Sequence, residues 1–174
     1  MKFESIFSLD LYLRIITPND VDESYVRWLQ DPEVNKYLEV RLEGVNLDTQ
    51  RDYVSKIYDS LDICLFGIFV EGDRMIGTIK IGPIDKELKT AELGLIIGDP
   101  RFWGKGYGTK AIEMICRTFL TSGLLKVITA GVYGGNIGSR KAFEKNDFVL
   151  ESSLQTSDLV IDGELQEIIR YRKA

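Results

Sequence analysis

The sequence predicts a single α/β (α+β) domain built on a mixed β-sheet, and three observations lead to this fold class. Apolar runs with strand periodicity and amphipathic segments with helical periodicity follow one another without strict alternation. The chain has 174 residues, which suits one domain with one sizeable core. No repeat, low-complexity segment or linker interrupts it, so we predict one domain over residues 1–174.

The first half of the chain is predicted to contain a strand, three helices and then two strands. Thr17-Pro18 reads as a helix start, because it offers a capping hydroxyl and then proline at the first helical position. Asp48-Thr49 is read in the same way as the start of a longer helix. The predicted elements are a strand over 9–16, a helix from Thr17 that Asp31-Pro32 ends, a short helix over 33–38, a loop over 39–46, a helix from Asp48 with Leu61 on its apolar face, and hairpin strands over 63–70 and 75–84.

The second half is predicted to alternate strands and helices and to end in a hairpin. Ala111, Ile112 and Ile115 repeat at helical spacing and mark one buried helix face. The predicted elements are a strand over 89–98, a helix over 105–120, a strand over 126–133, a helix over 136–146, and strands over 148–156 and 166–171.

Composition and charge exclude several classes of protein. The net charge of −5 and the pI of about 4.9 argue against a general nucleic-acid role, whose footprint is basic. No run of 18 apolar residues occurs and residues 1–4 do not read as a secretion signal, so we predict no membrane span and a cytoplasmic protein. Cys64 and Cys116 lie in apolar stretches, which predicts buried reduced thiols. The chain has no histidine, so no metal site is expected.

Residues 100–109 read Pro-Arg-Phe-Trp-Gly-Lys-Gly-Tyr-Gly-Thr and form the strongest motif. They follow an apolar strand and open a helix, so their backbone N–H groups and the helix dipole favour an anion. Three cations, Arg101, Lys105 and Lys110, accompany this run, and a pyrophosphate is the predicted guest. The motif fails the phosphate-loop pattern of NTPases, because Gly106 follows Gly104-Lys105, and it lacks the third glycine of the dinucleotide fingerprint. The alternative is a plain turn with solvated cations.

The pattern Arg101-x-x-Gly104-x-Gly106 resembles the acyl-CoA pyrophosphate loop of the GNAT superfamily of N-acetyltransferases. Residues 92–109 are similar to the branch with ribosomal-protein and small-molecule acetyltransferases. Residues 136–148 match a second block of the superfamily, N-x-x-S-x-x-x-[YF]-x-K-x-G-F, except that Asp147 replaces glycine. The resemblance covers roughly residues 9–173. It implies a strongly twisted mixed sheet, split near its middle and flanked by helices, and acetyl-CoA as co-substrate.

The resemblance also implies which residues hold acetyl-CoA. The backbone of the glycine loop would bind the pyrophosphate, and the exposed edge of the strand before it would pair with the pantetheine amides. The residues predicted to bind the cofactor are Leu95, Ile96, Ile97, Arg101, Gly104, Lys105, Gly106, Tyr107, Gly108, Thr109 and Asn136.

Glu92 is the predicted general base, because it lies among apolar neighbours on the strand before the loop. Partial burial there would raise its pKa toward neutrality. The alternatives are an outward-facing glutamate paired with a lysine of a neighbouring strand, and attack by an already neutral amine with water relaying the proton. Strand alternation places Glu92 with Gly94 and Ile96, opposite Ala91, Leu93, Leu95 and Ile97.

The proton donor to the thiolate is a second open question. Many family members have a tyrosine where this chain has Phe143, and a phenyl ring cannot donate a proton. Ser139 and Tyr133 are the candidate donors, whereas Phe143 is expected to pack in the core with Ala142 and Phe148. The alternative for Ser139 is a helix-start hydroxyl.

The acceptor region is predicted from the segment after the first strand and from the last hairpin, namely Trp28, Tyr37, Glu39, Arg41 and residues 155–166. Residues 28–41 are similar to acetyltransferases that act on amino sugars, which suggests a nucleotide-linked amino sugar, with Arg41 meeting a phosphate and Tyr37 stacking on a ring. The alternative interpretation of Trp28 and Tyr25 is that they pack in the core. We therefore predict transfer of an acetyl group to a primary amine of a small molecule. A protein N-terminus, a polyamine, or a non-catalytic acyl-CoA-binding module are the alternatives, and the sequence is compatible with a homodimer.

Overall fold

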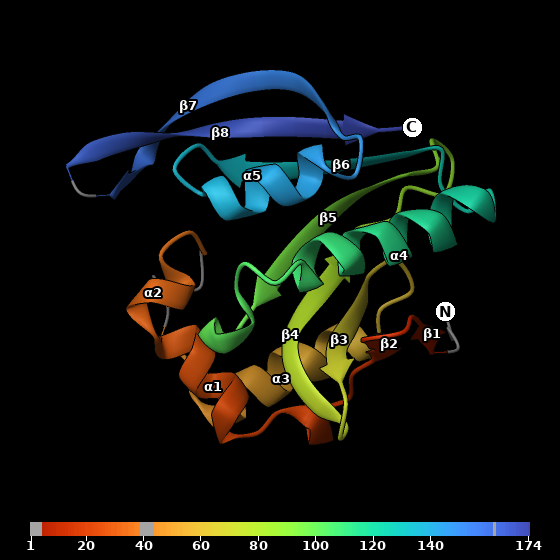
Figure 1. Cartoon of the computed structure of the whole chain (residues 1–174), viewed down its shortest axis with the longest axis vertical. Helices are drawn as coiled ribbons and strands as arrows, with labels where there is room; N and C mark the ends of the chain where they lie inside the picture. Colours follow the sequence, from red (N-terminus) through yellow and green to blue (C-terminus); the bar gives the residue numbers. More distant parts are fainter. Residues whose placement is uncertain (1–4, 39–43, 162) are drawn as a thin grey trace.

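An eight-stranded mixed sheet in the order β1-β2-β3-β4-β5-β6-β8-β7 runs through the molecule (Figure 1). The computed structural model describes residues 5–38, 44–161 and 163–174. Neighbouring strands are antiparallel except for β5 and β6, which are parallel. The predicted mixed sheet is therefore confirmed. The strands are β1 (Ile6–Phe7), β2 (Tyr12–Ile15), β3 (Cys64–Val70), β4 (Arg74–Ile81), β5 (Thr90–Ile97), β6 (Val127–Tyr133), β7 (Val149–Ile161) and β8 (Glu164–Lys173).

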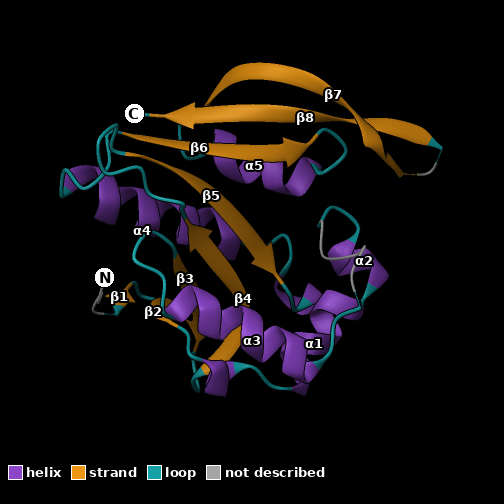
Figure 2. Cartoon of the chain, turned by 180° about the vertical axis from the view of Figure 1, so that it is seen from behind, coloured by secondary structure: helices purple, strands orange, loops and turns teal. Residues whose placement is uncertain are grey.

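Helices cover the two faces of the sheet unequally (Figure 2). α4 (Tyr107–Thr121) and α5 (Ile137–Glu144) pack on one face, where Ile112, Ile115 and Phe143 are buried in the larger core cluster. α1 (Glu23–Gln30) and α3 (Leu47–Tyr58) pack on the other face around a smaller cluster. The short α2 (Pro32–Asn35) follows α1. On this second face the helices lie over the β2–β4 half, and no helix of the described residues covers the β6–β8 half, which we call the uncovered face.

The sheet splits between β5 and β6 because the two strands pair only at their beginnings. Three residue pairs join them, from Thr90↔Val127 to Glu92↔Thr129. Beyond that point β5 continues to Ile97 beside β4, whereas β6 continues to Tyr133 beside β8. The two strands diverge visibly in Figure 1. The split that the resemblance implied is therefore present.

Several helix starts differ from the sequence prediction, each because a different residue supplies the cap. Pro18–Asp20 forms only a 3₁₀ turn, η1, and α1 begins at Glu23, where the Asp22 carboxylate accepts from the N–H groups of the first turn. α3 begins at Leu47 rather than at Asp48, because Asn46 accepts from the N–H of Thr49. Both helices follow the general rule that a side-chain oxygen caps the first turn.

The strand predictions are confirmed in order and corrected in extent. β1 was missed, because two residues are too few to give a period. The last hairpin is confirmed, but both of its strands are longer than predicted. Leu61 lies beyond the end of α3 and is exposed rather than on its apolar face.

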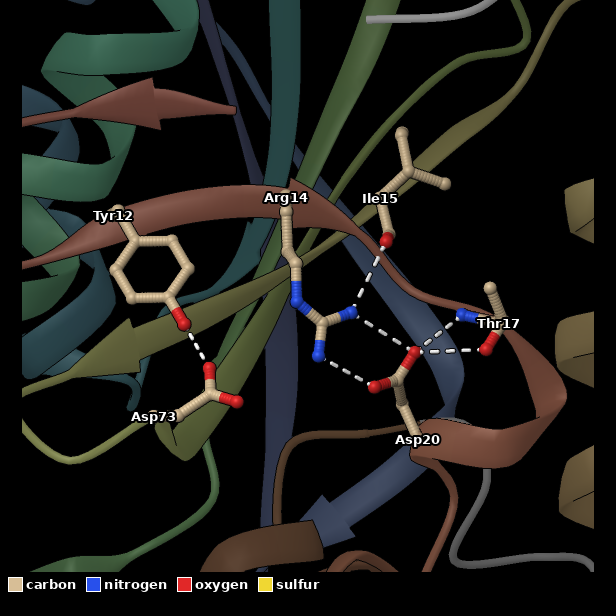
Figure 3. A network of polar contacts seen from close by, with 6 residues as sticks. All are labelled: Tyr12, Arg14, Ile15, Thr17, Asp20 and Asp73. Carbon is tan, nitrogen blue, oxygen red and sulfur yellow. Dashed lines mark hydrogen bonds and ion pairs between the residues drawn. The ribbon is translucent and has the colours of Figure 1, made fainter. Parts of the chain in front are cut away.

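A polar network fastens η1 to the sheet (Figure 3). Arg14 of β2 donates to both carboxylate oxygens of Asp20 at 2.6 and 3.0 Å, and its guanidinium lies 4.2 Å from the centre of the Phe69 ring. The backbone N–H and hydroxyl of Thr17 donate to the same carboxylate. Nearby, the Tyr12 hydroxyl donates to Asp73. The network fixes the direction in which the chain leaves β2 toward α1.

Gly77 on β4 is predicted to be intolerant of any side chain. A Cβ at this position would lie 2.2 Å from the carbonyl oxygen of Ile96 and 2.9 Å from the Cα of Ile97, both in β5 backbone. We expect Gly77→Ala to lower the free energy of unfolding by about 1–3 kcal/mol, as overpacking does. Denaturant unfolding measures this, with Gly44→Ala as control, because a Cβ there meets nothing within 4 Å. Equal stability of the two variants would contradict the close approach of β4 and β5.

Candidate active site

The free edge of β5 lies on the β6 side of the split and begins after Glu92. The carbonyl of Glu92 accepts from Gly82, and the N–H of Gly98 donates to Ile76, so the backbone groups of even-numbered residues face β4. The backbone N–H and carbonyl groups of Leu95 and Ile97 therefore face the split. The backbone groups of Ile96 face β4 instead, and its side chain packs against the α1–α3 cluster. Of the three residues predicted to bind pantetheine, two thus have their polar backbone groups at the free edge.

The glycine loop after β5 is shaped by left-handed backbone at two residues. Gly104 and Gly106 have φ of +70° and +86°, a region that L-residues with a Cβ avoid. Gly106 is the N-cap of α4, so the helix begins at Tyr107 rather than at the predicted Lys105, and no side chain of the described residues caps its first turn. Uncapped N–H groups at a helix start attract anions. Gly108 serves a different purpose, because a Cβ there would lie 3.1 Å from the Leu95 side chain on β5.

A nearly buried carboxylate, Asp99, fixes the start of this loop. It accepts from Arg101 at 2.9 and 2.8 Å and from Arg74 at 2.6 Å, and its side chain is only 6% exposed. The hydrogen bond from the Arg101 side chain holds the pKa of Asp99 below its usual range. Arg101, predicted at the rim of a pyrophosphate site, is thus partly engaged by the protein itself. Lys105 is exposed, with its ammonium 5.6 Å from the Phe102 ring centre.

Glu92 lies on the uncovered face of the sheet with its side chain half exposed. It accepts a hydrogen bond at 3.2 Å from Arg170 of β8, with the intervening strand β6 between them. This bridge passes over Gly131, where a Cβ would lie 3.1 Å from the Arg170 guanidinium and 3.5 Å from the Glu92 carboxylate. The ion pair considered as an alternative for Glu92 therefore exists, with an arginine in place of the expected lysine.

The candidate proton donors lie on the other side of the split. Tyr133 ends β6, and its ring centre is 6.5 Å from that of Tyr37, which follows α2. Ser139 lies in the first turn of α5, where its N–H donates to the side-chain oxygen Oδ1 of Asn136. Asn136 therefore uses its oxygen as a helix cap, which leaves its amide N–H groups for other partners. Phe143 is 2% exposed and packs edge-on to Phe148, so its predicted core position is confirmed.

The predicted acceptor region gathers at the carboxyl end of β5. Trp28 packs on Gly98, where a Cβ would lie 2.2 Å from the indole ring, whereas Tyr25 is buried in the core, and burial raises its pKa to about 12. A Cβ at Gly135 would lie within 3 Å of both the Tyr37 hydroxyl and the Gln166 side chain, so these two groups converge on the β6–α5 turn. Glu39 and Arg41 lie outside the described residues, as do the side chains of residues 154–158.

Sequence reasoning missed four residues that shape the site. Arg170 and Gly131 act through partners that are distant in the sequence, such as Glu92, which is 78 residues from Arg170, and Asp99 has one distant partner, Arg74, beside its near neighbour Arg101. Asn146 is also missed: its buried amide donates to the carbonyls of Thr109 and Ala142 and so ties α5 to the first turn of α4. Its place in the second sequence block was visible, but its contact with the glycine loop was not.

Both cysteines are buried with free thiols, as predicted, and burial raises the pKa of Cys116 to about 12. Within the described residues, no three histidine, cysteine, aspartate or glutamate side chains gather in a way that would hold a metal ion. None of the helices in that part of the chain combines the length and apolar character of a membrane span.

Comparison with known proteins agrees with this geometry. Residues 10–149 match the acetyltransferase (GNAT) domain family. An uncharacterised N-acetyltransferase p20 of Bacillus licheniformis is 33% identical over 156 residues, which cover 87% of this chain and 86% of that protein. The structure of RimL, a ribosomal L7/L12 alpha-N-protein acetyltransferase bound to coenzyme A, superposes with a TM-score of 0.86 at 18% identity over 98% and 97% of the two chains. The structure of the microcin C7 self-immunity acetyltransferase MccE in complex with acetyl-CoA and AMP superposes with a TM-score of 0.81 at 20% identity, over 95% of this chain and 93% of that chain.

The chain therefore belongs to the GNAT acetyltransferase family. It is an acetyl-CoA-dependent N-acetyltransferase, as the resemblance implied. The residues present fit such a donor: an uncapped helix start follows two left-handed glycines, and a free strand edge leads from the split to that loop. The likeness to RimL and MccE extends to the fold alone at this level of identity, so it does not select an acceptor.

Asp99 is predicted to stabilise the protein in a pH-dependent way. Its pKa is lowered in the folded state, so the stabilisation is present above the unfolded value of about 3.9 and is lost as pH falls below it. We expect Asp99→Asn to lower Tm at pH 7 by about 2–4 °C, with the difference from the parent protein shrinking below pH 4. Thermal unfolding across pH measures this. Asp52→Asn, on the exposed side of α3, is the control, and a pH-independent difference would contradict the assignment.

Proposed function

We propose that this enzyme acetylates the primary amine of a small molecule, with a nucleotide-linked amino sugar as the leading acceptor. The observation that carries the proposal is the position of Glu92. It lies on the uncovered face of the sheet at the last residue pair before β5 and β6 part. An acceptor amine bound on this face would reach a thioester held in the split, with the donor approaching from the opposite side.

The donor would be held by backbone rather than by charged side chains. We assign the pyrophosphate to the N–H groups of residues 104–108, with Arg101, Lys105 and Thr109 at the rim. The pantetheine arm would pair with the free edge at Leu95 and Ile97, and the Asn136 amide would reach it from α5. Pairing of an extended guest with a strand edge supplies aligned hydrogen bonds at little entropic cost to the protein.

In the reaction, the amine nitrogen attacks the thioester carbonyl carbon, the new C–N bond forms and the C–S bond breaks. We assign Glu92 to accept the proton that the amine loses, directly or through one water. Arg170 would hold the Glu92 carboxylate in place over Gly131. The leaving thiolate takes up one proton to become coenzyme A, and Ser139 and Tyr133 are the residues that we assign as alternative donors, since Phe143 has no proton to give.

Two features favour a small acceptor over a protein N-terminus. Tyr37 approaches Tyr133 across the end of the split, and Tyr37 and Gln166 both converge on Gly135. These contacts narrow the route that an extended peptide would need. The free buried thiols agree with a reducing compartment, so we place the enzyme in the cytoplasm.

The decisive experiment is a thiol-release assay with acetyl-CoA and a panel of amines. Nucleotide-linked amino sugars, polyamines, aminoglycosides and N-terminal peptides each represent one acceptor class. Release with an amino sugar and not with peptides supports the proposal. Release with peptides alone would favour a protein acetyltransferase, and acetyl-CoA binding without any release would favour a binding module.

Glu92→Gln is predicted to lower kcat by about 10²- to 10⁴-fold, the range that general-base catalysis contributes. Acetyl-CoA affinity, measured by calorimetry, should change little, because the carboxylate faces the acceptor side. Glu87→Gln, in the exposed turn before β5, is the matched control. A kcat within twofold of the parent enzyme would reject Glu92 as the base and favour attack by an already neutral amine.

Gly106→Ala is predicted to weaken coenzyme A binding by more than its effect on stability explains. Alanine at a φ of +86° costs about 1–2 kcal/mol and shifts the N–H groups of the loop. Gly123→Ala is the control, since Gly123 has a φ of +71° with the same open surroundings but lies at the far end of α4. Both variants should lose similar stability, and only Gly106→Ala should lose affinity in calorimetry. Equal affinities would remove the loop from the pyrophosphate site.

A further inference from the structure

A charged cleft lies on the uncovered face of the sheet beside Glu92. It has a volume of about 440 Å³, and its polar lining is Thr90, Glu92, Thr129, Glu151 and Arg172. The cleft extends from the paired end of β5 and β6 across to β8. The proposed base therefore forms one wall of a hollow large enough for part of a small acceptor.

Strand register places Arg172 directly across the cleft from Glu92. Glu92 pairs with Thr129 of β6, and Thr129 pairs with Arg172 of β8, so the three form one row. Neighbouring strands are about 4.8 Å apart, which puts the ends of this row about 10 Å apart at the backbone. Arg170, two residues earlier, points to the same face and is already bonded to Glu92.

Arg172 differs from Arg170 because it has no partner among the described residues. It is partly buried, and no hydrogen bond or ion pair with another described residue engages its guanidinium. Glu151 lines the same cleft without forming an ion pair with it. A guanidinium is always charged and carries five donors in a planar fork that matches carboxylate and phosphate oxygens. An unpaired fork beside a base is suited to an anion carried by the substrate.

We propose, building on the acetyltransferase function above, that the acceptor is an amine that also carries a phosphate or a carboxylate, and that Arg172 binds this anionic group. The amine then lies at Glu92, and the anion lies at the β8 end of the same row. At the β8 end of the row the positive charge of Arg172 favours this class over a polyamine, because a second ammonium placed beside its guanidinium would be repelled. The phosphate of a sugar nucleotide and the carboxylate of an amino acid share this chemistry.

Matched pairs of acceptors test the inference, because each pair differs only in the anion. Glucosamine 6-phosphate is compared with glucosamine, and glycylglycine with glycylglycinamide, by kcat/KM in the thiol-release assay. We expect the anionic member of one pair to be preferred by about 10- to 100-fold, the value of a charge-assisted hydrogen bond. Which pair shows the preference distinguishes phosphate from carboxylate. Equal kcat/KM within both pairs, preference for the members that lack the anion, or preference for spermidine over all four would overturn the inference.

Variants separate recognition from folding. In Arg172→Gln the ratio of kcat/KM values within the preferred pair should fall to about one. In Arg172→Lys part of the preference should remain. If Arg172 had a merely structural role, its substitution would lower kcat/KM for both members of a pair equally and leave their ratio unchanged. That result would overturn the inference. Arg117→Gln, exposed on α4, is the control.

A failure of the proposed function gives a different result. If no amine is acetylated, calorimetry of glucosamine 6-phosphate and glycylglycine on the coenzyme A complex decides the matter. Binding that Arg172→Gln abolishes supports the anion site without catalysis. No binding of either probe overturns the site as well.

Discussion

The parting of β5 and β6 after three residue pairs is the constraint on which the rest of the structure depends. Each strand is paired along its other side, β5 with β4 and β6 with β8, so the accumulated twist of the sheet carries the two strands apart. The separation leaves backbone donors and acceptors on β5 without a partner strand. The same separation brings the start of α4 to one side of the opening and α5 to the other.

Glycines occupy the positions where elements of the site approach one another closely. Gly131 lets Arg170 reach across β6 to Glu92, Gly108 lets α4 approach β5, and Gly98 accommodates the Trp28 indole. Each contact joins residues from different elements, so an added methyl group would separate parts that act together. Asp99 provides the complementary constraint, because its bonds to Arg74 and Arg101 hold the strand end against the loop.

The order of the elements and the glycine loop could be predicted from the sequence, because both depend on local patterns. The glycine-rich turn before the helix, the helix of the second block and the alternation of Glu92 with Gly94 follow from neighbouring residues alone. What could not be predicted depends on pairing between distant strands. The Glu92–Arg170 bridge requires the order β5-β6-β8, and the role of Ile96 requires knowing which edge of β5 meets β4. The cap of α1 was misassigned by five positions and that of α3 by two, because several aspartates and asparagines compete within a few residues of these two helix starts.

The indole of Trp103 donates to the carbonyl of Ile97 at 2.7 Å and so closes the free edge of β5 at its far end. At the near end, β6 covers the edge as far as Glu92, and the parallel pairing of Glu92 with Thr129 also engages the N–H of Leu93. Between these limits, Leu95 is the residue that presents both its N–H and its carbonyl to the opening. An extended guest along this edge consequently has a single register, since a shift of two residues in either direction meets an occupied position. The protein thereby fixes how far such a guest reaches from the loop, independently of the guest's own length.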